Sequence, residues 1–222
     1  ESDTYYGSKL VLYDSVNPNV GYKQQVKGFP CYMGIDPARE SDSFAITIIA
    51  EDKKAKMMYP VYQMKWEKTK FSTIVEEIFR LLDRYNVISI GLDMGGGGSH
   101  VRDLLLEPTN PSFEAVLDPD DEDSLKAIGE RQHKARKILR LLKPNSERNT
   151  RWNSAVKGLL QTGTLKFTDK MFVPRLPDRV EEKVLKCMVE TKKQFVMVKS
   201  KVHAQQNFLS FYIENGCKDL YS

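Results

Sequence analysis

The sequence is poor in cysteine and histidine and has no long apolar segment, and each shortage excludes a class of protein. Its 222 residues include three cysteines and three histidines. Cys31, Cys187 and Cys217 form no CxxC pair and are odd in number, so we expect a reducing compartment rather than a disulfide scaffold or a cysteine zinc site. Apolar runs such as Phe44–Ala50 are far shorter than the ~18 residues of a membrane helix. We therefore expect a soluble protein.

Net charge is also small, although charge is unevenly distributed along the chain. The 34 Lys and Arg residues exceed the 30 Asp and Glu residues by only four, which does not by itself indicate a nucleic-acid-binding protein. However, residues 118–123 hold five acids, whereas 131–157 hold nine Lys or Arg and the single acid Glu147. With 41% hydrophobic and 29% charged residues, the composition is that of a globular domain with a core.

The chain begins with Glu1 rather than Met and lacks the basic-then-apolar pattern of a signal peptide. Residues 1–30 mix Tyr, Ser, Asn, Pro and Gly without a sustained period. We expect a piece of a longer chain, in which residues 1–30 are a linker or lead-in and 31–222 form one domain.

The first part of that domain reads as strands followed by alternating helices and strands. Short polar turns separate three strand-like runs, which predicts an antiparallel meander, and Pro60 predicts an edge or a bulge in the third strand. A three- and four-residue apolar period then predicts a helix, with Thr73 and Glu76 as a capping box. The predicted elements are strands at 31–36, 44–49, 57–62 and 87–93, and helices at 71–85 and from Ser99. This order predicts an α+β or α/β domain with a mixed sheet.

The sequence after residue 124 has weaker patterns for predicting helices and strands. The predictions are helices at 125–142, 152–161, 180–190 and 203–214, and a strand at 194–198. The glycine run Gly95–Gly98 is not followed by the Lys of a GxxxxGK[ST] phosphate loop, so we assign it no nucleotide.

Two carboxylates stand where chemistry is expected, at the ends of predicted strands. Asp36 ends the first strand and Asp93 ends the strand after the first helix. If those strands are neighbours, both side chains emerge at one sheet edge, where hard divalent cations such as Mg²⁺ can bind oxygen ligands. The alternative is that each Asp merely caps a turn.

The order of several short motifs resembles the nuclease domain of large terminase subunits of tailed phages and herpesvirus-type viruses, over residues 31–222. The motifs are Met33–Ala38 with Asp42 following, Ile90–Asp93 with its glycine turn, Ile138–Arg140 through Asn153, Leu159–Leu160, Leu165–Phe167, Glu190–Gln194 and Gly216–Ser222. The resemblance implies an α/β, RNase H-like fold of the RuvC/integrase type, a mixed central sheet flanked by helices. It also implies a truncated last helix and an ATPase domain preceding residue 31.

Position by position, the resemblance implies a catalytic and metal-binding triad of Asp36, Asp93 and Asp219. Two Mg²⁺ or Mn²⁺ ions would support hydrolysis of a DNA phosphodiester bond, with Asp36 bridging them. Asp42 is either an outer ligand or, as we favour, a turn cap. Lys218 either contacts a phosphate or is a solvated lysine.

A basic tract could follow the DNA backbone, since Lys and Arg neutralise phosphates regardless of sequence. Its members are Arg131, Lys134, Arg136, Lys137, Arg140, Arg148 and Arg151. The alternative is a solvated helix face, or pairing with the acids at 118–123.

The implied function is a metal-dependent endonuclease that cuts concatemeric viral DNA during genome packaging. The expected partners are double-stranded DNA, the ATPase domain, the small terminase and the portal, with no membrane partner, in the cytoplasm of an infected host cell. Two alternatives stay open: another RNase H-like nuclease, such as a Holliday-junction resolvase or transposase relative, and a non-catalytic DNA-binding or assembly module.

Overall fold

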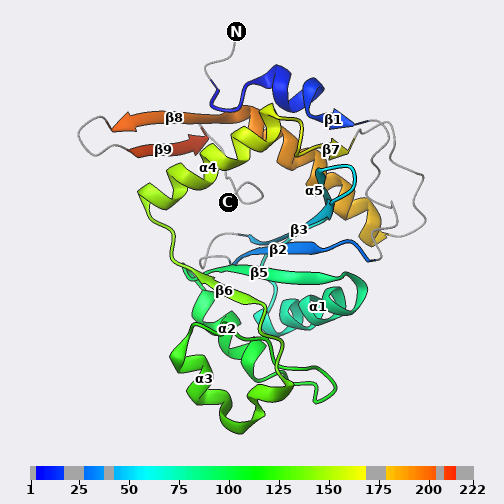
Figure 1. Ribbon diagram of the computed structural model, residues 1–222, viewed down its shortest axis with the longest axis vertical. Helices are drawn as coiled ribbons and strands as arrows, with labels where there is room; N and C mark the ends of the chain where they lie inside the picture. Colours follow the sequence, from blue (N-terminus) through cyan, green and yellow to red (C-terminus); the bar gives the residue numbers. More distant parts are fainter. Residues whose placement is uncertain (1–3, 18–27, 38–42, 169–178, 204–207, 214–222) are drawn as a thin grey trace.

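A mixed five-stranded sheet forms the centre of the protein (Figure 1). The computed structural model describes residues 4–17, 28–37, 43–168, 179–203 and 208–213. The strand order is β4-β3-β2-β5-β6, in which β3 runs antiparallel to its neighbours while β2, β5 and β6 run parallel. The strands are β2 (Cys31–Asp36), β3 (Phe44–Asp52), β4 (Met57–Trp66), β5 (Val87–Asp93) and β6 (Leu139–Leu142). The three parallel strands therefore all end at one edge of the sheet.

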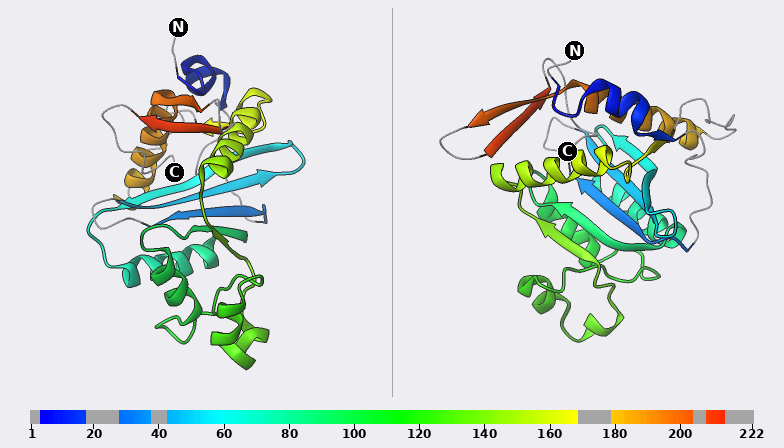
Figure 2. Two further views of the ribbon diagram at one scale, coloured as in Figure 1. Left: turned by 90° about the vertical axis from the view of Figure 1, so that its left-hand side faces the viewer. Right: turned by 45° about the horizontal axis from the view of Figure 1, so that its top comes forward.

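Helices cover both faces of this sheet (Figures 1 and 2). The helices α1 and α2 lie on one face, called the α1 face below, and α4 and α5 lie on the other, called the α5 face. Their bounds are α1 (Phe71–Arg84), α2 (Gly98–Leu106), α3 (Glu122–Ile128), α4 (Ser146–Gln161) and α5 (Arg179–Met197), with a 3₁₀ helix η2 at Gly129–Lys134. Within the described part of the chain, none of these helices has the length and apolarity needed to cross a bilayer.

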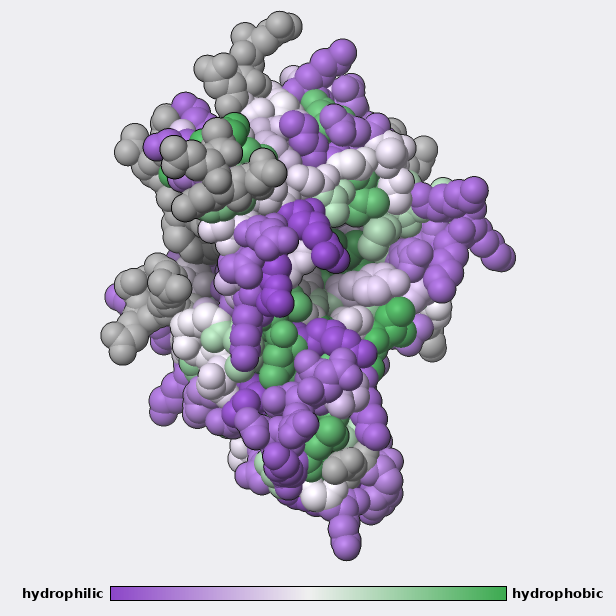
Figure 3. Space-filling model, turned by 60° about the vertical axis from the view of Figure 1, so that its left-hand side comes forward, coloured by the Kyte–Doolittle hydropathy of each residue, from purple (hydrophilic) through white to green (hydrophobic). Residues whose placement is uncertain are grey.

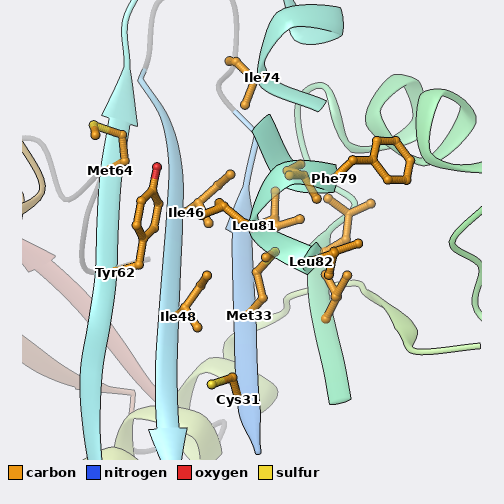
Figure 4. Packing of buried hydrophobic residues seen from close by; sticks show 14 of the residues in the cluster. Cys31, Met33, Ile46, Ile48, Tyr62, Met64, Ile74, Phe79, Leu81 and Leu82 are labelled. Atoms are coloured by element: carbon orange, nitrogen blue, oxygen red, sulfur yellow. The ribbon is translucent and has the colours of Figure 1, made fainter. Parts of the chain in front are cut away.

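The α1 face carries the main core, because side chains alternate along each strand. In β2, Cys31, Met33 and Ile35 are buried, whereas the residues between them are more exposed. Figure 4 shows such residues of β2, β3 and β4 pointing toward the buried stripe of α1, which includes Ile74 and Leu81. Burial raises the pKa of the Cys31 thiol to about 11, so this cysteine is a core residue rather than a nucleophile.

A second cluster joins the start of the chain to α4 and α5. Tyr6 and Val11 are buried against Leu160 and Phe195. Nearby, a π-helical turn at Leu10–Asp14 leads into strand β1 (Val16–Asn17), which pairs with β7 (Phe167–Thr168). Part of the predicted lead-in is thus packed into the fold, while a domain boundary at residue 31 stays a prediction.

Most elements predicted for the first hundred residues are confirmed, including the meander, the first helix and the strand that follows it. The special position of Pro60 is also confirmed, because β4 is an edge strand and its register with β3 shifts between Ile48 and Ile49, next to Pro60. The predicted capping box of Thr73 and Glu76 is wrong, because Lys70 is the N-cap of α1 and makes no side-chain cap hydrogen bond.

Three later predictions are wrong. The helix predicted at 125–142 ends at Ile128, where Gly129 has a φ of 54°, and its last residues form strand β6. The predicted strand 194–198 is mostly the end of α5. The predicted helix 203–214 is instead strand β9 (Phe208–Ile213), which pairs with β8 (Val198–His203). In the first and last cases, pairing with a neighbouring strand overrides local helix propensity.

Candidate active site

Asp36 and Asp93 are brought together at the edge where the parallel strands end. β2 and β5 are neighbours, and Ile35 pairs with Leu92. Continuing this register by one residue sets Asp36 beside Asp93, on strands about 4.8 Å apart. Both follow a residue buried on the α1 face, so both carboxylates lie on the α5 face. The predicted convergence of these two strand ends is confirmed by the topology.

The glycine turn after β5 fixes the conformation of Asp93. The Gly95 amide donates a 2.7 Å hydrogen bond to Asp93 Oδ1. A Cβ on Gly98 would lie 2.2 Å from the Asp93 carbonyl oxygen, so only glycine lets α2 begin this close to the strand. Gly96 has a φ of 55°, which glycine adopts without strain. These glycines are therefore a rigid support for the carboxylate, a role that sequence reasoning missed.

One half of the α5 face is closed by α5. Cross-strand pairing places Lys65 and Ala45 in the same row as Asp36. Ala45 packs against Cys187 of α5, and Lys65 Nζ lies 3.5 Å from Glu190 Oε1 on the same helix. Helix α5 thus covers β3 and β4 up to the strand that carries Asp36.

The other half of this face, over β2, β5 and β6, combines glycines with larger side chains, because a Cβ on Gly91 would come within 3.0 Å of Leu142 Cδ1. The register places Gly34 beside Gly91 and Gly91 beside Arg140. Gly34 is exposed, and a Cβ built there would meet nothing within 4 Å. Asp36 and Asp93 therefore lie next to the half that α5 covers, and Leu142 lies beside Asp93 on the same face.

Asp36 and Asp93 match the oxygen ligands that Mg²⁺ and Mn²⁺ prefer, and half-exposure leaves both carboxylates accessible. A complete site needs a further ligand, because the described ranges contain no cluster of three His, Cys, Asp or Glu side chains able to hold a metal. The predicted third acid, Asp219, lies outside the described residues, as do Asp42 and Lys218. The two strand-end carboxylates fit a divalent cation as part of its ligand set.

The predicted basic tract divides between two ends of the sheet. Arg148 and Arg151 are exposed residues of α4, which follows β6 in the chain and lies on the α5 face (Figure 1). Figure 3 shows this side of the molecule to be mainly hydrophilic, with small apolar areas. Arg140 lies within β6 itself, not on the helix predicted for it.

The remaining tract members precede β6 and so lie toward the opposite edge. Arg136 Nε is 2.9 Å from Glu114 Oε2, and its Nη2 is 3.6 Å from Asp83 Oδ1 near the end of α1. Arg131 Nη2 is 3.5 Å from Glu107 Oε1. Lys134 and Lys137 are exposed in the same segment. The tract is therefore not one continuous surface.

Asp118 is a buried acid of the 118–123 cluster that has a structural task. It is 6% exposed and accepts hydrogen bonds from the Leu141 amide at 2.8 Å and the Asp120 amide at 3.0 Å. Because Leu141 lies on the last strand of the sheet, the carboxylate covers an otherwise open edge amide. The acid-rich composition of 118–123 gave no hint of this individual role.

Comparison with known proteins agrees with this arrangement. A model of the terminase RNaseH-like domain family matches residues 33–171, more than half of the chain. No curated protein matches.

Solved structures show the same fold. The magnesium-bound large terminase nuclease from thermophilic phage G20c superposes with a TM-score of 0.56 at 11% identity, covering 100% of this chain and 94% of that one. The large terminase of bacteriophage HK97 gives a TM-score of 0.57 at 10% identity, covering 100% of this chain and 42% of that longer one. The predicted RNase H-like fold, a mixed sheet flanked by helices, is confirmed.

Proposed function

The chain belongs to the terminase RNaseH-like domain family, and from this membership we propose that it is the nuclease domain of a large terminase. The proposed reaction is metal-dependent hydrolysis of phosphodiester bonds in concatemeric viral DNA. The observation that carries the proposal is that Asp36 and Asp93 each follow the paired residues Ile35 and Leu92, at the ends of neighbouring parallel strands. Two neighbouring carboxylates supply oxygen ligands that a divalent cation can share.

Asp36 and Asp93 would hold Mg²⁺ or Mn²⁺, with Asp219 as the proposed third ligand. Such ions, when bound as a pair, lower the pKa of water and stabilise the leaving oxygen of a phosphodiester. This chain's own contribution is to orient the carboxylates. The Gly95 amide donates a hydrogen bond to Asp93 Oδ1 and so restricts the rotation of that side chain. The second oxygen, Oδ2, is therefore held in one orientation before a ligand binds.

The proposal also covers the metal, the rest of the full-length protein, the substrate and the partners. The solved relatives include a magnesium-bound and a cobalt-bound terminase nuclease, which supports divalent metal use here. This chain spans 42% of the HK97 large terminase, which supports an ATPase domain elsewhere in the full protein. We propose double-stranded DNA as substrate, the small terminase and the portal as partners, and the cytoplasm of an infected cell as the place of action.

The test is plasmid nicking by the purified chain in Mg²⁺ or Mn²⁺, with EDTA as the metal-free arm. Asp36→Asn and Asp93→Asn should each abolish cleavage while circular dichroism and thermal unfolding remain close to wild type. Asp103→Asn is the matched control, because Asp103 is an exposed acid on α2. Asp219→Asn tests the third ligand in the same assay.

Full cleavage in EDTA, or by either strand-end variant, would exclude the proposed metal chemistry. Equal binding of DNA by all variants with no cutting in any metal would instead favour a non-catalytic binding module. Preference for four-way junctions over linear duplex would favour a resolvase.

A further inference from the structure

The hairpin of β8 and β9 has two faces of different chemistry, because side chains alternate along each strand. The inner face consists of Val198, Ser200 and Val202 of β8 with Leu209, Phe211 and Ile213 of β9. Val198 is fully buried, and the Phe211 ring lies 4.9 Å from the Tyr5 ring between centroids. Near the tip, Val202 extends beyond this packing and is exposed. The inner face therefore belongs mainly to the second core cluster.

The outer face of the hairpin is polar and basic. Its members are Lys199, Lys201 and His203 of β8 with Phe208, Ser210 and Tyr212 of β9. Lys201 and Tyr212 are exposed, and Lys199 is half-buried. Residues 191–213, which include the whole hairpin, contain four lysines and no Asp or Glu. The two lysines of β8 thus give the outer face a positive charge that no acid of the same segment offsets.

The hairpin is fixed to the rest of the domain through β9. The Leu209 amide donates a 2.8 Å hydrogen bond to the Thr150 hydroxyl of α4. On the outer face, the His203 ring stacks on the Phe208 ring at 4.7 Å between centroids, and its Nε2 lies 3.0 Å from Ser210 Oγ. The outer face is therefore largely held in place before a ligand binds, which lowers the entropic cost of binding.

The hairpin extends toward the side of the molecule that carries the strand-end carboxylates. In Figure 1, β8 runs in the same direction as β5 and β6 and ends on the side where those strands end. The left-hand view of Figure 2 looks onto this side and shows the hairpin, α4 and the edge of the sheet together. A DNA duplex engaged at Asp36 and Asp93 extends well beyond these two residues, and the hairpin lies on the side from which it approaches.

The outer face fits the sugar-phosphate backbone of DNA. Lys199 and Lys201 are two residues apart on one face, about 7 Å along the strand, so they can contact separate phosphates of one DNA strand. Tyr212 pairs with Lys199 across the hairpin, and tyrosine hydroxyls commonly donate hydrogen bonds to phosphate oxygens. Lysine is depleted in protein–protein interfaces, which favours DNA over a protein partner.

We propose that the outer face of the hairpin binds the sugar-phosphate backbone of the substrate DNA, away from the cut, through Lys199, Lys201 and Tyr212. This inference rests on the proposed nuclease function and adds a second DNA contact to it. Phosphate contacts of this kind fix the register and orientation of a duplex and carry no sequence information. The hairpin thus holds the duplex in position while the carboxylates act on one bond.

The test compares the double variant Lys199→Gln/Lys201→Gln with Lys53→Gln/Lys54→Gln. The control removes the same charge from the turn between β3 and β4, where both lysines are exposed, at the edge opposite the strand-end carboxylates. Binding of a fluorescent duplex is measured by anisotropy in EDTA, over a range of salt. Each lost phosphate contact reduces the magnitude of the slope of log K against log salt by about 0.9. The hairpin variant should therefore lose about 1.8, and the control should keep the wild-type slope.

Two further variants separate charge from hydrogen bonding. Lys199→Arg/Lys201→Arg should restore the wild-type slope, because arginine keeps the charge. Tyr212→Phe removes a hydroxyl and no charge, so it should weaken binding by about two- to tenfold at every salt concentration and leave the slope unchanged. Thermal unfolding of all variants should stay close to wild type, because the changed side chains lie outside the inner face.

Cleavage kinetics supply a second readout. Lys199→Gln/Lys201→Gln should raise KM and leave kcat near wild type, because the contact lies away from the reacting atoms. A wild-type salt slope in this variant, or an equal loss of slope in the control, overturns the inference. If Asp93→Asn abolishes cleavage while the hairpin variant binds and cleaves DNA as wild type does, only this inference fails. If the chain cleaves DNA in no metal, the nuclease proposal fails, and the slopes measured in EDTA still decide whether the hairpin binds DNA.

Discussion

The two faces of the central sheet are made by the same strands and have opposite character. On the α1 face, alternate residues of β2 and β5 such as Met33, Ile35 and Leu92 are almost completely buried. On the α5 face, the residues between them include Gly34, Asp36 and Asp93, which are partly or fully exposed. The contrast shows how one strand can stabilise the domain with one side and present carboxylates with the other, since its side chains alternate.

This division makes neighbouring residues respond differently to substitution. Leu92→Ala removes a fully buried side chain from the α1 face and should lower the free energy of unfolding by about 2–5 kcal/mol. Asp93→Asn, one residue later, should change it by about 1 kcal/mol or less, because the Asn oxygen can still accept the Gly95 amide. Urea denaturation checks both values.

An equal loss of unfolding free energy in Asp93→Asn and Leu92→Ala would contradict the proposed difference between the two faces. That result would mean that the carboxylate is part of the folding core and that loss of cleavage in Asp93→Asn reflects unfolding. Cleavage by folded Leu92→Ala at low temperature is the complementary check.

Gly98→Ala tests the turn between β5, the strand that ends at Asp93, and helix α2. The added Cβ would lie 2.2 Å from the Asp93 carbonyl oxygen, so the helix or the strand must shift. We expect a loss of about 1–3 kcal/mol together with reduced cleavage. The control is Gly158→Ala in α4, where a Cβ meets nothing within 4 Å. This substitution should stabilise the protein, because alanine has a higher helix propensity than glycine. Wild-type stability and activity in Gly98→Ala would show that the turn is not a rigid support.

The smallest expected effect comes from a buried tyrosine of the α1 face. Tyr62 is 4% exposed, and its hydroxyl finds no hydrogen-bond partner among the described residues. Burial raises the pKa of this hydroxyl far above its usual value. Tyr62→Phe should therefore be neutral or stabilise the protein by up to about 1 kcal/mol.

On the α5 face, the Tyr32 hydroxyl donates a 2.9 Å hydrogen bond to Glu51 Oε2. Tyr32→Phe should therefore cost about 0.5–1.5 kcal/mol. Thermal unfolding of the two variants compares them directly, and a destabilised Tyr62→Phe would contradict the absence of a partner.

Local patterns in the sequence were enough to predict the strands and helices around Asp36 and Asp93. Short polar turns separate the strands of the meander, and α1 has an apolar period of three and four residues. Leu139–Leu142 was misread as helix, because four residues rich in Leu carry no period of their own. They become a strand through pairing with β5 and through the Asp118 cap on the Leu141 amide. Those partners are distant in sequence.

The candidate site shows the same division. The sequence by itself determined which residues end the strands, that these ends carry carboxylates, and that a glycine turn follows the second one. Only the tertiary structure decided that β2 and β5 are parallel neighbours in register, that Gly98 must lack a Cβ, and that the basic tract is split between two ends of the sheet. The physical reason is that strand order and close approach arise from contacts between remote segments, whereas alternation and turn chemistry are properties of adjacent residues.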